Sequence, residues 1–206
     1  MNDITIYSIY AESVRRYDMG RLEAAMPDRV RKASRCVFER DRLLSLGAGI
    51  LLLECLGLKN ETELRYTEYE KPYAPGCPAF NISHSGEYVI LAVGGNTIGA
   101  DIERIDPANT VVAPLVCTAR ELAWMSEEPL QRFFRLWVWK ESVMKATGLG
   151  MNLDPASFDV MPFAAGESVV VDGREWYARE LALGCCRIAV CSDKPIGDVR
   201  LVSYEV

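Results

Sequence analysis

The sequence predicts an α+β fold, because strand-like and helical segments follow one another in the same order in each half of the chain. A strand-like segment, a helical region and further strand-like segments occur within residues 1–100, and this order returns within residues 101–206. Half of the residues are apolar and they are spread along the whole chain, which indicates a folded core. At about 150 residues per domain, the 206 residues allow one domain or two small ones. We therefore expect two α+β units, one in each half.

The first half is expected to begin with a strand and to continue with helices. Residues 3–9 are rich in β-branched and aromatic side chains, and the charged residues 13–38 favour helix. A long apolar run predicts a buried helix over residues 42–56, with Asp41 as its N-cap and Gly57 at its end.

Short strands and turns are expected next. Residues 64–69 alternate apolar and polar side chains as a half-buried strand does, whereas residues 71–78 are rich in proline and predict a loop. Strand-like segments follow at residues 79–83 and 88–93, and His84 falls in the turn between them.

The second half repeats this order. Residues 97–105 are strand-like, and residues 118–121 have the spacing of a capping box, which predicts the start of a short helix. Pro129 suits the first turn of a longer helix that we expect to end at Gly148. The remaining residues, 157–206, contain several strand-like runs separated by glycine, aspartate and proline.

Charge and cysteine content limit the classes of function. A net charge of −6 argues against a protein that binds nucleic acid through its overall charge. The first residues lack the basic region and apolar core of a signal peptide, and the most apolar run, residues 43–58, is too short for a membrane span. Seven cysteines without a C-x-x-C motif, and a single histidine, are typical of free thiols in a reducing compartment. We expect a cytoplasmic protein that binds neither nucleic acid nor membrane.

Two carboxylates lie two residues apart in the predicted strand 97–105. Strand alternation places Asp101 and Glu103 on one face, where they repel each other unless a cation lies between them. Magnesium prefers such hard oxygen ligands and completes its shell with water or substrate phosphates. The alternative is a solvated strand end with no ligand.

A second group of charged residues lies on the predicted helix 129–147. Trp137, Glu141 and Lys145 are spaced by four residues and therefore share one helix face. The tryptophan is expected to pack while the two charged side chains point to its rim. The alternative is an ordinary amphipathic helix with a surface Glu–Lys pair.

A third group lies between the strands 79–83 and 88–93. Ser83, His84 and Ser85 place hydroxyl and imidazole groups where a turn can present them to an anion. A histidine satisfied by ordinary polar contacts is the alternative.

Taken together, these segments resemble the 4′-phosphopantetheinyl transferases of the surfactin-synthetase-activating (Sfp) type. The matching segments are Lys71-Pro72, residues 80–86 (FNISHSG), 98–103 (IGADIE), 137–145 (WVWKESVMK) and 201–205 (LVSYE). The resemblance implies two similar α/β halves related by a pseudo-twofold axis, with the active site in the cleft between them. It also implies transfer of phosphopantetheine from coenzyme A to a serine of an apo carrier protein, with release of 3′,5′-ADP.

The resemblance also implies a role for each matching residue. Asp101, Glu103 and Glu141 would bind Mg²⁺, or Mn²⁺ in its place, which would also hold the coenzyme A pyrophosphate. Glu141 would act as the base for the carrier serine, and Lys145 would bind the pyrophosphate and stabilise the leaving phosphate. The residues implied to bind the rest of coenzyme A are Arg29, Lys32, Lys71, Pro72, Ser83 and His84.

Such two-half enzymes are expected to act as monomers on an acyl or peptidyl carrier protein.

Two other classes of function remain open from the residues. One is a Mg²⁺-dependent phosphohydrolase or nuclease, in which acidic pairs followed by glutamate and lysine also occur. The other is a non-catalytic relative that only binds the carrier or coenzyme A, against which the complete set of acidic residues and Lys145 argues.

Overall fold

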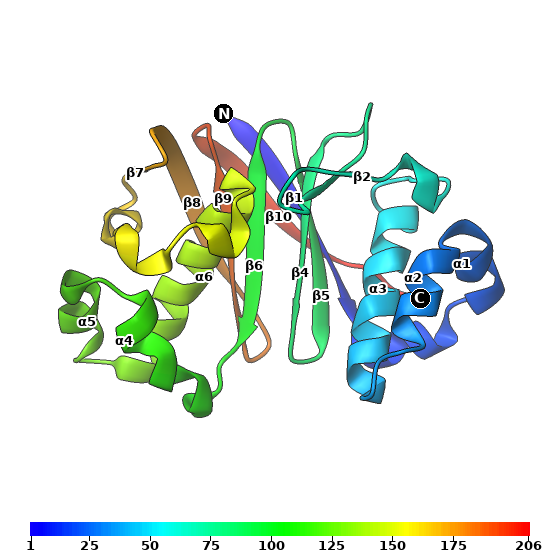
Figure 1. Ribbon diagram of the computed structural model, residues 1–206, viewed down its shortest axis with the longest axis horizontal. Helices are drawn as coiled ribbons and strands as arrows, with labels where there is room; N and C mark the ends of the chain where they lie inside the picture. The colour runs from blue at the N-terminus through cyan, green and yellow to red at the C-terminus, as the bar shows by residue number, and fades with distance from the viewer.

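The computed structural model, which describes residues 1–206, contains two four-stranded sheets packed face to face, each covered by helices on its outer side (Figure 1). The first sheet has the order β10-β1-β5-β4, with the strands β1 (Asn2–Tyr10), β4 (Ala79–Ser85), β5 (Tyr88–Gly94) and β10 (Ile196–Ser203). The second has the order β6-β9-β8-β7, with β6 (Ile98–Arg104), β7 (Val169–Val171), β8 (Arg174–Leu183) and β9 (Cys186–Ser192). A separate short hairpin pairs β2 (Arg65–Tyr66) with β3 (Pro72–Tyr73). The α+β fold class is therefore confirmed.

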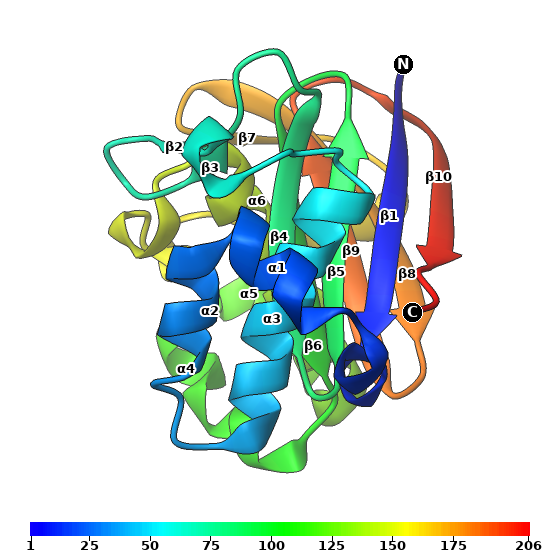
Figure 2. The same ribbon diagram turned by 90° about the vertical axis from the view of Figure 1, so that its right-hand side faces the viewer.

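The helices form the two outer layers. The first sheet is covered by α1 (Met19–Ala25), α2 (Pro27–Ala33) and α3 (Glu39–Glu54), which Figure 2 shows in front of the strands. On the side of the second sheet lie α4 (Ala113–Val116), α5 (Ala119–Met125) and the long α6 (Pro129–Thr147). Short 3₁₀ turns occupy Ala11–Arg16, Glu61–Glu63, Pro107–Val112, Gly150–Asn152, Pro155–Ser157 and Met161–Ala165. No helix has the length and apolar character that a membrane crossing requires.

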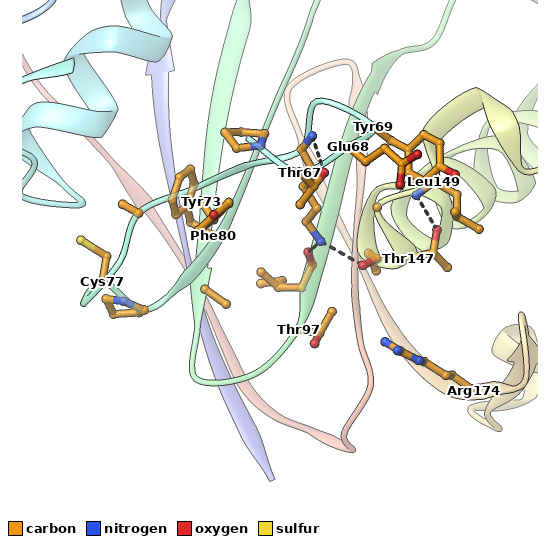
Figure 3. A pocket seen from close by; sticks show the side chains of 18 residues that line it. Thr67, Glu68, Tyr69, Tyr73, Cys77, Phe80, Thr97, Thr147, Leu149 and Arg174 are labelled. Carbon is orange, nitrogen blue, oxygen red and sulfur yellow. Dashed lines mark hydrogen bonds between the residues drawn. The ribbon is translucent and has the colours of Figure 1, made fainter. Parts of the chain in front are cut away.

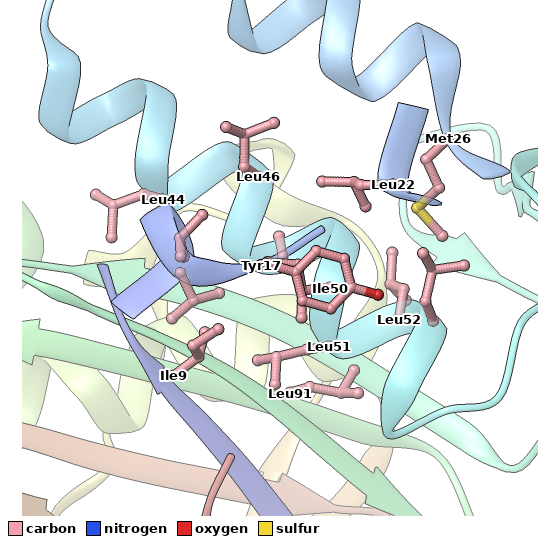
Figure 4. Close-up of a cluster of buried hydrophobic side chains, with 14 of the residues drawn as sticks. Ile9, Tyr17, Leu22, Met26, Leu44, Leu46, Ile50, Leu51, Leu52 and Leu91 are labelled. Carbon is pink, nitrogen blue, oxygen red and sulfur yellow. The ribbon is translucent and has the colours of Figure 1, made fainter. Parts of the chain in front are cut away.

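Three hydrophobic clusters match the three contacts between these layers. In the first, α3 packs on β1 and β5, and Figure 4 shows Leu51 against Leu91 and Ile9 there. In the second, α6 packs on the second sheet around the fully buried Trp176. The third lies between the two sheets and consists largely of isoleucine, valine and alanine. Burial at about 25 cal/mol per Å² of apolar surface makes these clusters the main source of folding free energy.

The last strand of the chain returns to the first sheet. β10 runs parallel to β1, with Thr5 opposite Arg200 and Tyr7 opposite Val202. The second half of the chain therefore contributes one strand, β10, to the sheet of the first half. The division into two units at residue 100 remains a prediction.

Several element boundaries differ from the sequence-based expectation. The helix expected over 42–56 spans Glu39–Glu54, and its N-cap is Phe38 without a side-chain bond, so Asp41 is not the cap. The strand expected over 64–69 has only two residues, because the chain turns to pair with β3. His84 was expected in a turn, but β4 continues through Ser85 because its pairing with β5 extends to that residue. The capping box at residues 118–121 and the helix stop at Gly148, which has a φ of 80°, are confirmed.

The edge strands of the two sheets, β4 and β6, are joined by side chains. Alternate polar side chains of β4 accept hydrogen bonds from alternate backbone N–H groups of β6. The bonds join Asn81 to Ala100, Ser83 to Ile102 and Ser85 to Arg104, at 2.8, 3.4 and 3.0 Å. A strand exposes one side chain in two on each face, so residues 81, 83 and 85 are the ones that can face β6. We call this set of bonds the β4–β6 ladder.

Gly99 allows α6 to lie directly on β6. A Cβ atom at this position would lie 2.0 Å from the Ser142 carbonyl oxygen and 2.3 Å from the Ala146 nitrogen, both of them backbone atoms of α6. Lys71 ties the same two elements together, because its Nζ donates to the Ile98 and Ala146 carbonyls at 2.9 Å each. Gly99 therefore permits the close approach of α6 to β6, and the ammonium group of Lys71 holds the two elements together.

We predict that Gly99→Ala lowers the free energy of unfolding by about 1–3 kcal/mol or more, because the backbone of α6 must move away from β6. Gly95→Ala is the matched control, since its Cβ would meet only Asn2 Oδ1 at an ordinary 3.6 Å. That variant should stay within about 0.5 kcal/mol of the parent protein. Urea unfolding followed by circular dichroism measures both, and equal midpoints for the two variants would contradict the close contact.

Candidate active site

The two carboxylates of β6 face β4 and α6. Asp101 is 2% exposed, and its Oδ1 accepts a hydrogen bond from the Ser83 hydroxyl at 2.9 Å. Glu103 is held on both oxygens, by the Ser85 hydroxyl at 2.7 Å and by the indole N–H of Trp137 at 3.4 Å. The expectation that both carboxylates lie on one face of a strand is met.

The helix α6 brings a third carboxylate and a lysine to this place. Nζ of Lys145 lies 2.5 Å from Asp101 Oδ1, 3.0 Å from Ser83 Oγ and 3.9 Å from Glu141 Oε2. The ring of Trp137 stacks on that of Phe133, with 6.3 Å between the ring centroids, so the tryptophan packs as expected. The site therefore joins residues that are about 40 positions apart in the sequence through one strand and one helix.

The charges of this cluster perturb one another. Burial raises the pKa of Glu141 to about 7, and the negative charges of Asp101 and Glu103 add to the rise against the opposing effect of Lys145. Burial and Asp101 also raise the pKa of Glu103. Burial opposes the charge of Lys145, yet Asp101 and Glu141 raise its pKa. The negative charge of the three carboxylates therefore exceeds the single positive charge of Lys145.

The donor chemistry of this cluster suits a hard divalent cation. The three carboxylates supply oxygen ligands of the kind that Mg²⁺ prefers, and Asp101 Oδ2 is buried without a hydrogen-bond partner. No three acidic, histidine or cysteine side chains are arranged so that they could hold a metal ion together. Instead, the ammonium of Lys145 supplies positive charge beside Asp101. The orphaned Asp101 Oδ2 is the oxygen left for an additional cation.

Two adjoining cavities lie next to this cluster and share Lys71 and Pro72. The smaller, of about 220 Å³, reaches Lys145, and the larger, of about 600 Å³, extends towards Thr97 and Arg174 (Figure 3). Two of the three ammonium donors of Lys71 are used by backbone carbonyls, and burial lowers its pKa to about 8. Lys71 therefore both lines the cavities and braces α6.

Of the other residues expected to bind coenzyme A, only Ser83 contacts the carboxylates. Ser83 is buried among Asp101 and Lys145, whereas His84 is exposed and, by strand alternation, on the opposite face of β4. Arg29 and Lys32 line a separate cavity of about 300 Å³ on α2, where Nε of Arg29 is buried without a partner. No contact joins these two basic residues to the acidic cluster.

Two features of the site region were not recognised in the sequence. The first is the hydrogen bond from the Ser85 hydroxyl to Glu103. The only signal for this bond in the sequence is that Ser85 lies two residues after Ser83. Lys140 is fully buried, pairs with the fully buried Glu121 at 2.9 Å and donates to two backbone carbonyls. Glu121 also accepts from the N–H groups of Thr118 and Val160, so its capping role, which the sequence predicts, is part of a buried ion pair that fixes α5 to α6.

The raised pKa of Glu141 predicts how the stability of the metal-free protein depends on pH. Its pKa in the folded state, about 7, lies above its ordinary value of 4.5, so the folded state binds this proton more tightly than the unfolded state does. The resulting stabilisation is complete below pH 4.5 and is lost as the pH rises through 7. It corresponds to up to about 3 kcal/mol.

Glu141→Gln, which keeps the neutral shape at every pH, should therefore gain stability relative to the parent protein between pH 4.5 and 7. Urea unfolding at several pH values, in the presence of a chelator, measures the difference. Parallel profiles for the two proteins would mean that Glu141 titrates normally.

Comparison with known proteins matches the segment that carries this cluster. Residues 97–191 match the family model described as the 4′-phosphopantetheinyl transferase superfamily. The 4′-phosphopantetheinyl transferase Sfp of Bacillus subtilis (strain 168) is 30% identical over 197 residues, which cover 87% of this chain and 88% of that protein. The transferase ffp of Bacillus subtilis is 34% identical, with 71% of each chain covered. The transferase gsp of Aneurinibacillus migulanus is 38% identical over 52% of this chain and 47% of its own length. The chain belongs to the 4′-phosphopantetheinyl transferase superfamily and is of the Sfp type.

Proposed function

We propose that this protein transfers the 4′-phosphopantetheine group of coenzyme A to a serine of an apo acyl or peptidyl carrier protein, with release of 3′,5′-ADP. One observation carries the proposal: Asp101, Glu103, Glu141 and Lys145 converge beside a cavity, within the segment that matches the transferase family. Three carboxylates and a lysine suit phosphoryl transfer, in which catalysis depends on positioning and on balancing charge.

In this proposal, the cluster binds one Mg²⁺ ion through Asp101, Glu103 and Glu141, and Mn²⁺ is an alternative. When bound, the ion neutralises negative charge on the coenzyme A pyrophosphate. The orphaned Asp101 Oδ2 and the mutual repulsion of the carboxylates support this assignment.

Glu141 and Lys145 are proposed to handle the protons and the leaving group. The carrier serine oxygen forms a bond to the β-phosphorus of coenzyme A as the bond from that phosphorus to the bridging oxygen breaks. Glu141 accepts the serine proton, directly or through water. Lys145 stabilises the negative charge that develops on the departing 3′,5′-ADP, since its pKa is raised and it remains an ammonium group.

We propose that coenzyme A lies along the boundary of the two sheets. Lys71 and Pro72 would line the nucleotide part, in the cavities that adjoin Lys145. An apolar pocket of about 270 Å³ beside Glu103 suits the dimethyl part of the pantetheine chain. The residues proposed to contact the adenosine phosphates are Arg29, Lys32, Ser83 and His84.

The remaining expectations follow the same proposal. The two halves, 1–100 and 101–206, would be related by a pseudo-twofold axis with the active site in the cleft between them. The protein would act as a monomer in the cytoplasm and bind neither nucleic acid nor membrane. An acidic carrier would dock through apolar contacts and a local basic rim, since the net charge of this chain is −6.

We predict that the protein adds phosphopantetheine to an apo carrier protein in the presence of coenzyme A and Mg²⁺. Mass spectrometry of the carrier measures the gain of the phosphopantetheine mass. Asp101→Ala and Glu141→Gln should abolish transfer while the circular dichroism spectrum stays unchanged, because each removes a ligand and the latter also removes the base.

Ser126→Ala is a suitable control, because this hydroxyl only bonds the Ala123 carbonyl at the end of α5. No modification of any of several apo carriers, from fatty acid, polyketide and nonribosomal peptide systems, would refute the proposed function. Turnover near that of the parent protein in either active-site variant would refute the proposed metal site.

A further inference from the structure

The hydroxyl group of Ser85 bonds two neighbours on β6. It donates to Glu103 Oε2 at 2.7 Å and accepts from the backbone N–H of Arg104 at 3.0 Å. A serine hydroxyl has a single donor and two acceptor positions, so its only proton is committed to the carboxylate. The bond from the Arg104 N–H fixes the position of the Ser85 oxygen, and the bond from the Ser85 hydroxyl in turn fixes the position of Glu103 Oε2.

The same arrangement occurs one step earlier in the β4–β6 ladder. The Ser83 hydroxyl donates to Asp101 at 2.9 Å and accepts from the N–H of Ile102 at 3.4 Å. Each serine of β4 therefore bridges a carboxylate of β6 and the backbone N–H of the residue that follows it. Asn81, the first member of the ladder, bonds only a backbone N–H, because the residue before its partner is Gly99 and carries no side chain.

A free glutamate side chain at this position would sample several rotamers, and ordering it would oppose ion binding. Ser85 removes part of this freedom before any ligand arrives, and Trp137 holds the other oxygen of Glu103 at 3.4 Å. The lone pairs that these two donors leave unused remain available to a cation. Partners of this kind typically change metal affinity or activity by about 10–100-fold.

We propose that Ser85 is a positioning residue, which orients the Glu103 carboxylate for binding a divalent cation by anchoring it to the backbone of β6. The inference rests on the cation site of the proposed function and does not depend on the reaction that the site performs. It deepens that proposal by assigning a role to the ladder, because the bonds that join the two sheets also preorganise the ligands of the ion.

The test compares three variants for Mn²⁺ binding, measured by the electron paramagnetic resonance signal of free Mn²⁺ without carrier or coenzyme A. Ser85→Ala should bind Mn²⁺ about 10-fold or more weakly. Ser85→Thr keeps the hydroxyl and suits a strand, so it should restore affinity to within about threefold of the parent protein. Asn81→Ala removes a ladder bond that touches no carboxylate, so it should lower the melting temperature and leave Mn²⁺ affinity within about threefold.

The same proteins are then compared in the transfer assay, where Ser85→Ala should raise the Mg²⁺ concentration needed for the half-maximal rate by about 10-fold. Unchanged Mn²⁺ affinity in a folded Ser85→Ala variant would overturn the inference. Equal weakening by Asn81→Ala, or failure of Ser85→Thr to restore affinity, would overturn it as well, since the effect would then come from a loosened ladder. A parent protein that binds Mn²⁺ but modifies no carrier would refute the proposed function and leave the role of Ser85 standing.

Discussion

The structure depends on how the backbone N–H groups of one edge of β6 are satisfied. On the side that faces β4, these groups have side-chain partners instead of a strand backbone, and a buried donor without a partner costs about 1–3 kcal/mol. Only short polar side chains at every second residue of β4 can reach them, which accounts for Asn81, Ser83 and Ser85. The two serines also bond Asp101 and Glu103, so the interaction that closes the boundary between the sheets positions the carboxylates there.

The second constraint is the close packing of α6 on β6. Gly99 removes the side chain that would collide with the helix backbone, and Lys71 joins the start of β6 to the last turn of α6. On the far side, the buried pair of Lys140 and Glu121 fixes α6 to α5. As a result, Glu141 and Lys145 reach the carboxylates of β6 from a helix that has little freedom to shift, as a site for phosphoryl transfer requires.

Strand and helix periodicities are local properties, so the sequence predicted correctly which charged residues share a face, whereas the resemblance alone implied that the two pairs meet. Asp101 and Glu103 share a strand face, and Glu141 and Lys145 share a helix face, whatever the rest of the chain does. The boundaries of α3 and the place of His84 were wrong because they depend on pairing and packing with distant residues. The role of Ser85 and the dual position of Lys71 could not be predicted, since their partners lie in elements whose arrangement no local pattern specifies.

The most direct test of this account is the position of Mn²⁺ in crystals of the protein, located by anomalous X-ray scattering. The account predicts one strong peak bound by oxygens of Asp101, Glu103 and Glu141, with the Ser85 hydroxyl still bonded to Glu103. A crystal saturated with Mn²⁺ that shows no peak at these carboxylates, and in which Lys145 alone balances their charge, would contradict it.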